Sequence, residues 1–173
     1  MEFICEKDVL MGGVLVVERI VSSKSTLPII GNVLVESKKN GIKISANNLE
    51  LGIEIFLEAK VIKEGSILIP AKTLAAMVSK LPKGSIDFKV SEKGIIKVSY
   101  SQSHFSIHGL PPDEFPTLPK IKEEKVITIG SGMFLDMIKK TIFSVSTSED
   151  KYVLNGVLLE IGRSGISGDN SNV

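Results

Sequence analysis

The residues that could carry out catalysis or hold a metal are few in this chain, and they are poorly grouped. His104 and His108 lie four positions apart in a stretch that reads as a strand, which puts both on one face. That spacing suits zinc ligands on a helix better than on a strand, and no acidic residue lies between them. Asp113 and Glu114 are adjacent, but their segment is rich in proline, so we interpret them as a solvated pair rather than as a general acid and base.

Cys5 is the only cysteine, which excludes a disulfide within the chain and fits a reducing compartment. It lies beside Phe3 and Ile4 in a predicted strand, with nothing nearby to lower its pKa, so we expect an inert thiol in the core. The N-terminus lacks the layout of a signal peptide, and no apolar run approaches the ~20 residues that a bilayer requires. We therefore expect a cytoplasmic protein that does not associate with a membrane.

Sequence motifs of enzymes are absent as well. The sequence has no glycine-rich phosphate loop, no closely spaced set of cysteines and histidines, and no nucleophile elbow. We therefore predict no catalytic residue, no cofactor and no metal. The 21 Lys and Arg residues nearly balance the 20 Asp and Glu residues, so the net charge predicts no strong attraction to nucleic acid.

The strongest feature of the sequence is an internal repeat. A shift of 124 positions places Val33 on Val157, Leu34 on Leu158 and Glu36 on Glu160 without a gap. A unit of that length leaves room in 173 residues for one whole unit and the first part of a second. A partial unit cannot bury its apolar face unaided, so we expect either further chain in the native protein or a compromised product.

Hydrophobic periodicity divides the first unit into strands and two helices. Apolar residues recur at helical spacing from Lys7 to about Ser22, and again over residues 71–81, where Leu74 and Val78 point inward. The first helix is apolar on part of its other side too, so we expect that side to be covered. The predicted strands are 2–5, 32–36, 42–46, 51–61, 66–69, 86–90, 95–100 and 104–110. This order predicts an α+β fold in which an antiparallel sheet is covered on one face by two helices.

Residues 110–124 carry four of the seven prolines, a density that forces an extended path and marks a domain boundary. We predict a complete domain over 1–120, a linker over 121–125 and the start of a second domain over 126–173. The elements expected in the second domain are a strand at 126–129, Ser131 as a helix N-cap, a helix to about Ser144 with Phe134, Ile138 and Ile142 inward, a strand at 156–161, and frayed residues beyond 164.

Lysines lie opposite the apolar stripes of two predicted helices. Lys72 and Lys80 do so on the second helix, and Lys139 and Lys140 on the helix of the second unit. Solvated helix faces commonly carry lysine, which is one interpretation. The other is that the repeated helices line a common surface that faces a phosphate backbone.

Several short segments point to a known family. They are Thr26–Asn32, Ile69–Lys72, Leu81–Gly84, Phe105–Ile107 with the later Leu110-Pro111 and Phe115-Pro116, and Val153–Leu158. Together they resemble the bacterial DNA polymerase III beta subunit, the replicative sliding clamp, over about residues 1–162. The resemblance implies the DNA-clamp fold, three copies of one domain per chain, and two chains closed head to tail into a homodimeric ring around duplex DNA. It also implies DNA polymerase III and its clamp loader as partners.

The resemblance carries over to individual residues. Lys24 matches a basic loop position that touches DNA in clamps, and Lys151 with Tyr152 matches a second such loop, where Val153 departs from the aromatic residue of some members. Phe105 and Ile107 match apolar positions of an edge strand at the ring-closing interface, and an exposed apolar edge is otherwise prone to aggregation. Leu154 matches one wall of a cleft that accepts short peptides from polymerase and clamp loader.

The resemblance implies a processivity factor that is not an enzyme and that tethers a polymerase to DNA by topology. Such a slider needs only weak, sequence-independent phosphate contacts, which agrees with the nearly neutral charge. After the strand at Glu160 the family continues with an acidic segment that bears Gly-His-Arg, whereas this chain runs through residues 167–173 and stops. Without the rest of the second unit and a third unit no ring can close, so a truncated inactive remnant and a stand-alone protein-binding module remain as alternatives.

Overall fold

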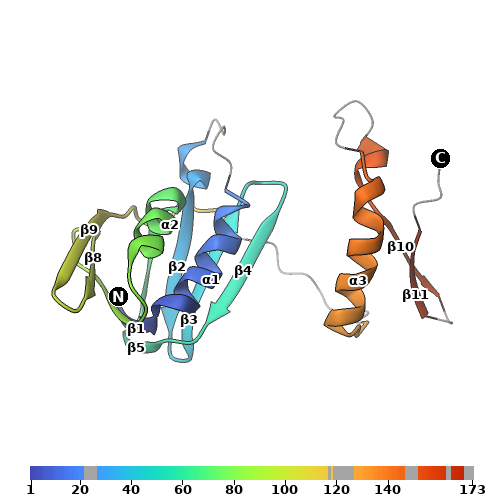
Figure 1. Ribbon diagram of the computed structural model, residues 1–173. Coiled ribbons are helices and arrows are strands. Elements are labelled where there is room, and N and C mark those ends of the chain that lie inside the picture. The colour runs from blue at the N-terminus through green and yellow to red at the C-terminus, as the bar shows by residue number, and fades with distance from the viewer. Residues whose placement is uncertain (22–26, 117, 119–126, 147–151, 163–164, 170–173) are drawn as a thin grey trace. The chain divides into compact units, whose positions relative to one another are not determined.

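In a computed structural model, the chain divides into two compact units, Met1–Lys120 and Ile121–Val173. The structure describes residues 1–21, 27–116, 118, 127–146, 152–162 and 165–169, with the side chains of Tyr152 and of 165–169 excepted. The predicted linker 121–125 lies outside the described residues. Figure 1 shows the helices and strands of each unit.

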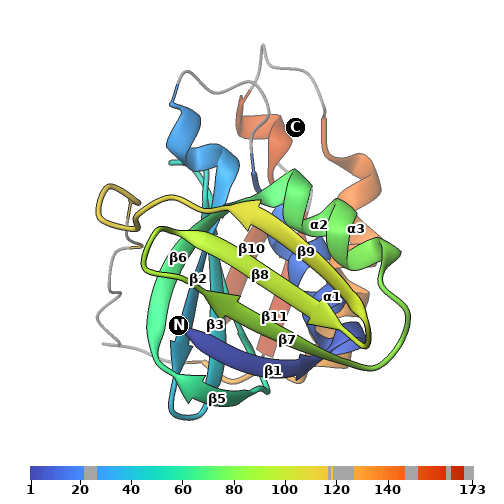
Figure 2. The same ribbon diagram turned by 90° about the vertical axis from the view of Figure 1, so that its left-hand side faces the viewer.

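The first unit contains a five-stranded antiparallel sheet. Its strands run in the order β5-β1-β7-β8-β9 and are β1 (Glu2–Glu6), β5 (Lys60–Lys63), β7 (Ser85–Val90), β8 (Ile95–Tyr100) and β9 (Ser103–His108) (Figure 2). Side chains alternate as a half-buried sheet requires: in β7, Ile86 and Phe88 are buried while Asp87 and Lys89 are exposed. The rings of Phe3 and Phe88 stack across the ladder with their centroids 4.7 Å apart.

A second antiparallel sheet has four strands in the order β4-β3-β2-β6. The strands are β2 (Asn32–Lys38), β3 (Gly41–Asn47), β4 (Gly52–Leu57) and β6 (Gly65–Pro70), and the 3₁₀ helix η1 (Pro28–Gly31) precedes β2. The sequence predicted a single strand over 51–61, and this was wrong. β4 pairs with β3 whereas β5 pairs with β1, so the chain crosses from one sheet to the other at Glu58 and Ala59.

Two helices, α1 (Lys7–Glu18) and α2 (Ala71–Lys80), pack on each other and complete the first unit. The buried side chains of α1 include Leu10, Val14 and Val17, and they join residues of both sheets in one hydrophobic core. The α+β class with antiparallel strands and two helices is confirmed, although the strands form two sheets rather than one. α1 ends at Glu18 rather than near Ser22, because the amides of Ile20 and Val21 turn back in tight 3₁₀-type hydrogen bonds to Val17 and Glu18.

The proline-rich segment is packed on the first unit as far as Leu118. Leu110 exchanges two backbone hydrogen bonds of 3.0 Å with Leu68 and so extends the edge of β6. The Asn47 side-chain amide donates to the Pro116 carbonyl at 3.1 Å, and Phe115 is buried. Gly52 leaves room for Leu118, because a Cβ at that glycine would collide with the leucine side chain. The described part of the proline-rich segment, residues 110–116 and 118, is therefore packed against this domain.

The second unit repeats the start of the first. It contains α3 (Ser131–Thr141), the 3₁₀ helices η2 (Ile142–Ser144) and η3 (Tyr152–Asn155), and the hairpin of β10 (Leu158–Gly162) and β11 (Gly165–Asp169). Shifted by 124 positions, α1 begins where α3 begins, and η1 falls on η3. The repeat found in the sequence is thus also a repeat of structure.

Four expectations for the second unit were wrong. Residues 127–129 form no strand, because the 124-residue shift places the counterparts of β5 and β7, which flank β1, beyond Val173. Ser131 is the first helical residue, and the N-cap is Gly130. The α3 stripe is not buried: Phe134 and Ile138 are 39% and 38% exposed and Ile142 is more so. Among the described residues of this unit, the sheet available to cover the stripe is a two-stranded hairpin. Residues 165–169 do not fray but pair with β10.

Candidate nucleic-acid and subunit interfaces

The lysines of α2 lie where the sequence predicted. Lys72 and Lys80 are exposed on the face opposite Leu74 and Val78, which are buried. Lys80 occupies the last turn, where a cation also interacts favourably with the helix dipole. Both ammonium groups are therefore free to meet a negatively charged partner.

The lysines of α3 are exposed as well. Lys139 and Lys140 occupy its last turn, on a helix that has no buried residue in this chain. The repeat-equivalent positions on α1 are Leu15 and Val16, which are 42% and 43% exposed. We expected this side of α1 to be covered, whereas these two side chains are partly exposed.

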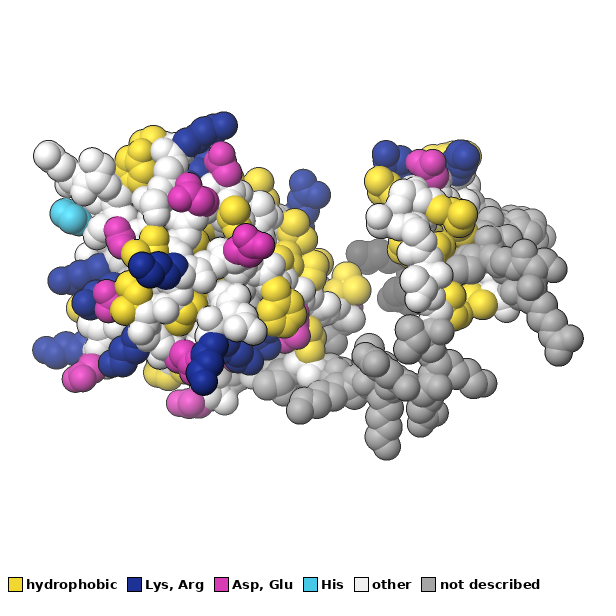
Figure 3. Space-filling view, turned by 90° about the horizontal axis from the view of Figure 1, so that it is seen from below, with side chains coloured by type: hydrophobic (Ala, Val, Ile, Leu, Met, Phe, Trp, Pro, Cys, Tyr) yellow, Lys and Arg dark blue, Asp and Glu magenta, His cyan; other side chains and the backbone are white. Residues whose placement is uncertain are grey.

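Charge on the first unit is mixed rather than concentrated. On the face seen in Figure 3, Lys and Arg side chains alternate with Asp and Glu, and hydrophobic side chains lie between them. Such a surface has no single-sign field that would hold DNA tightly or orient it.

β9 forms one edge of the five-stranded sheet, as the prediction of an edge strand required. Phe105 is 40% exposed, whereas Ile107 is half buried against the core. On the opposite face of the strand, the Nδ1 atom of His104 lies 3.0 Å from the Ser99 hydroxyl oxygen. The edge thus presents a large apolar side chain together with backbone groups of a terminal strand, which is the form of an interface for another strand.

The remaining predicted positions belong to loops and to the second unit. Lys24 and Lys151 lie outside the described residues, and so does the side chain of Tyr152. Leu154 is 37% exposed in η3, and the neighbouring Val153 is 88% exposed. Asp113 and Glu114 are both exposed, which confirms the interpretation as a solvated pair.

The four-stranded sheet carries a cluster of three charged side chains that could not be predicted from the sequence. The Lys43 ammonium lies 2.7 Å from a Glu36 carboxylate oxygen and 2.8 Å from one of Glu54. Desolvation opposes the charge on Lys43, but hydrogen bonds with Glu36 and Glu54 outweigh it and raise the pKa of Lys43. The hydrogen bond from Lys43 lowers the pKa of Glu54 in return. The three residues come from three strands, so only the strand register brings them together.

Neither a metal site nor a membrane span is found in the part of the chain that the structure describes. No group of three His, Cys, Asp or Glu side chains there could hold an ion, and no helix there is long and apolar enough to cross a bilayer.

Cys5 should resist alkylation in the folded protein. Its side chain is buried, and this burial raises the pKa of the thiol to about 12. A raised pKa favours the neutral thiol in the folded state, so its contribution to stability is complete below pH 9.0 and is lost as the pH rises towards 12. We expect iodoacetamide to modify Cys5 at pH 8 at least about 100 times more slowly in buffer than in denaturant, as mass spectrometry would show. Equal rates would contradict the burial.

Comparison with known proteins gives these surfaces a context. Residues 1–119 match the model of the family described as "DNA polymerase III beta subunit, N-terminal domain". The chain belongs to this family. It is 32% identical to the beta sliding clamp of Halalkalibacterium halodurans and 35% identical to that of Synechocystis, over 93% and 91% of this chain.

Solved structures agree with the family. A DNA polymerase sliding clamp from Bacillus subtilis superposes with a TM-score of 0.86 at 29% identity, over 95% of this chain and 45% of its own. A DNA polymerase III beta subunit from Eubacterium rectale gives 0.85 at 29% identity, over 93% and 44%. The clamp fold is therefore confirmed. The chain spans 44% of the length of the Halalkalibacterium clamp and 42% of that of the Synechocystis clamp.

Proposed function

We propose that the chain is the N-terminal portion of a sliding clamp, a DNA polymerase processivity factor that itself catalyses no reaction. The observation that carries the proposal is the repeat: the same elements begin again 124 residues along, in a chain whose first 119 residues match the N-terminal domain of the family. Residues 1–120 form the complete first clamp domain, and 126–173 begin the second.

In the intact protein, two chains close into a ring around duplex DNA. The β9 edge, with Phe105 and Ile107, forms one side of the closing interface. The ring keeps its polymerase near the template by topology, which raises effective concentration without tight contacts. The nearly neutral formal charge of +1 supports this, because a sliding ring requires contacts that break easily.

Weak phosphate contacts come from Lys72 and Lys80 on α2 and from Lys139 and Lys140 on α3, with the loops at Lys24 and Lys151–Tyr152 as further contributors. The exposure of the four helix lysines supports this assignment. Leu154 belongs to a cleft for peptides of DNA polymerase III and the clamp loader. Its partial exposure in η3 is what a cleft wall needs.

Alone, the 173-residue chain should bind DNA weakly or not at all. We expect no saturable binding to a linear duplex below about 1 μM at about 150 mM salt, as fluorescence anisotropy would show, because an open chain has no topological hold. Residual binding at low salt should fall when Lys72, Lys80, Lys139 and Lys140 become Gln. The matched control Lys93→Gln, on the turn between β7 and β8, should leave it unchanged. Sub-micromolar affinity at physiological salt would contradict the proposal.

The size of the protein in its own cells decides between the proposal and a truncated remnant. The 173-residue chain has a mass of 18.7 kDa. If the chain is part of a clamp, an immunoblot should detect an endogenous protein of more than twice that mass. In primer extension with its polymerase, that protein should lengthen the products made in one binding event. An endogenous mass of 18.7 kDa would favour the remnant or a stand-alone binding module.

A further inference from the structure

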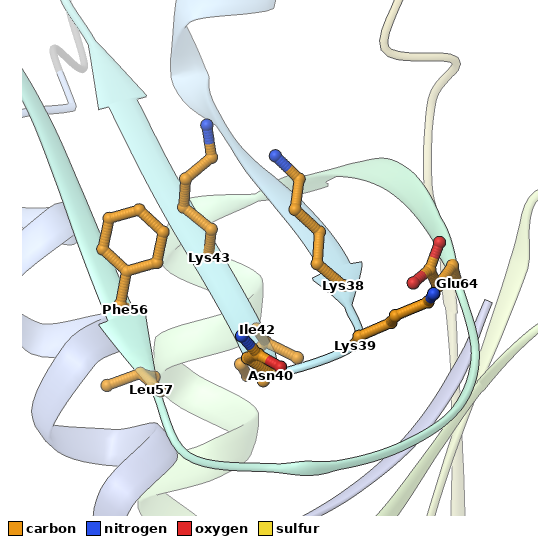
Figure 4. Close-up of a pocket in the computed structure, with 9 residues that line it drawn as sticks. Lys38, Lys39, Asn40, Ile42, Lys43, Phe56, Leu57 and Glu64 are labelled. Atoms are coloured by element: carbon orange, nitrogen blue, oxygen red, sulfur yellow. The ribbon is translucent and has the colours of Figure 1, made fainter.

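A cavity of about 550 Å³ lies at the turn between β2 and β3, on the first unit. Figure 4 shows Lys38 and Lys43 projecting in the same direction beside the Phe56 ring, with Lys39 on the side of Glu64. Leu57 lines it close to Ile42. A concave site with apolar walls and a few polar groups is the usual form of a binding pocket.

Phe56 is the main apolar surface of this pocket. It is 74% exposed, more than any other large hydrophobic side chain described in the first unit. The register places it directly opposite Lys43, on the outward face of β4. A phenyl ring held open on a sheet offers a flat face on which an aromatic or large aliphatic group of a ligand can pack.

The lysines around the ring differ in their freedom to bind a ligand. Lys43 is held between Glu36 and Glu54, and its side chain is only 15% exposed. Lys38 is 63% exposed and lies 3.8 Å from Glu36, at the limit of an ion pair, and Lys39 forms none among the described residues. Lys38 can therefore accept an anionic group at the rim beside Phe56, while Lys43 serves to fix the sheet and Lys39 lies apart, on the side of Glu64 (Figure 4).

The backbone is closely packed where β3 begins, beside the pocket. β3 begins at Gly41, whose φ is +140°. A Cβ at this position would clash with the backbone carbonyl oxygen of Leu57. Only glycine permits so close an approach of the two strands. The backbone strands that carry Phe56 and Lys38 are consequently held close together at this turn.

We propose that this pocket is a docking site for a short peptide that carries an aromatic or large aliphatic side chain next to a carboxylate. The apolar group packs on Phe56, and the carboxylate meets Lys38, beside the ring in Figure 4. A nucleic acid is disfavoured, because Glu36, Glu54 and Glu64 lie in or beside the pocket and would repel a run of phosphates, whereas one carboxylate reaches the lysine rim alone. The site rests on this geometry and not on DNA tethering.

The test is a titration of the ¹⁵N-labelled 173-residue chain, followed by NMR. The probe is acetyl-Gly-Asp-Phe-Gly-amide, with the same peptide bearing Ser in place of Phe and the oligonucleotide dT10 as comparisons. We expect saturable shifts confined to the amides of residues 38–43, 56, 57 and 64, with a Kd of about 1 mM or below. The Ser peptide should bind at least about 10-fold more weakly, and dT10 should leave these amides unchanged.

Variants separate the two halves of the site. Phe56→Ala should weaken binding of the Phe peptide at least about 10-fold, and Lys38→Gln should weaken it and reduce its salt dependence. Ile62→Ala, which truncates an exposed residue of β5, should have no effect and serves as the control. Absent or scattered shifts, dT10 binding at these residues, or full binding to Phe56→Ala would each overturn the proposal, and none of them would bear on DNA tethering.

Discussion

Phe88→Ala should destabilise the first unit by about 3–5 kcal/mol, the cost of truncating a fully buried phenylalanine. The Phe88 side chain is 1% exposed and stacks on Phe3, which is 0% exposed, at the centre of the five-stranded sheet. Removing the ring forfeits the stacking contact and leaves a cavity that neighbouring strands cannot close, because their registers are fixed by the ladders on both sides. The urea midpoint of the 173-residue chain should fall by about 2 M.

The matched control is Phe56→Ala. It makes the same chemical change in a strand of the same unit, but the Phe56 side chain is 74% exposed, so the free energy of unfolding should change by less than about 0.5 kcal/mol. Equal shifts of the urea midpoint for the two variants would show that the core is not packed around the stacked Phe3 and Phe88 rings.

If the proposed function holds, replacing Phe105 and Ile107 together by Arg should prevent ring assembly of the full-length clamp. Both residues lie on β9, the edge of its sheet, and charged side chains there would leave unpaired cations in an apolar interface. We expect the dissociation constant of the dimer to rise at least about 100-fold, as sedimentation equilibrium would show, and processive synthesis to be lost with it.

Ile62→Arg provides the control for that experiment. Ile62 lies on β5, the opposite edge of the same sheet, and is 55% exposed, so this variant tests whether any arginine at a sheet edge perturbs the fold. It should leave dimerisation unchanged. Dimerisation that survives the change at Phe105 and Ile107 would remove β9 from the interface.

Much of the fold could be predicted because local patterns decide it. The helix at 71–81 and the exposure of Lys72 and Lys80 follow from the spacing of Leu74 and Val78, and the structure agrees to within a residue. The edge position of β9 came from the family resemblance, as no local pattern reveals which strands are neighbours. The repeat predicted the existence of α3 and its start to within a residue, but α3 ends at Thr141 and the expected continuation to Ser144 is the 3₁₀ helix η2.

Other features depend on pairings between distant residues and were missed for that reason. The break between β4 and β5 could not be predicted, because residues 51–61 contain no proline or turn motif at that point. The break arises because the two strands join different sheets. The prediction of a strand at 126–129 was wrong because it rested on local propensity, and a strand also needs neighbouring strands to pair with. Strand register alone brings Lys43 together with Glu36 and Glu54. It also places Phe56 opposite Lys43, which forms the pocket.

The exposed apolar side of α1 shows where a repeat misleads. Leu15 and Val16 stand where α3 has Lys139 and Lys140, so the two helices share a backbone but present different chemistry to solvent. Equivalent position therefore does not imply equivalent charge, and each proposed DNA contact has to be tested by its own substitution.

The central claim, a topological tether, is tested most directly by retention on circular DNA. The endogenous protein would be isolated from its own cells, loaded on a nicked circular plasmid with its clamp loader and ATP, and passed over a gel-filtration column before and after the circle is cut. We predict that the protein elutes with the circle at about 150 mM salt and is lost once the DNA is linear. Equal retention on circular and linear DNA would contradict the account, since a tether by topology must fail when the DNA has ends.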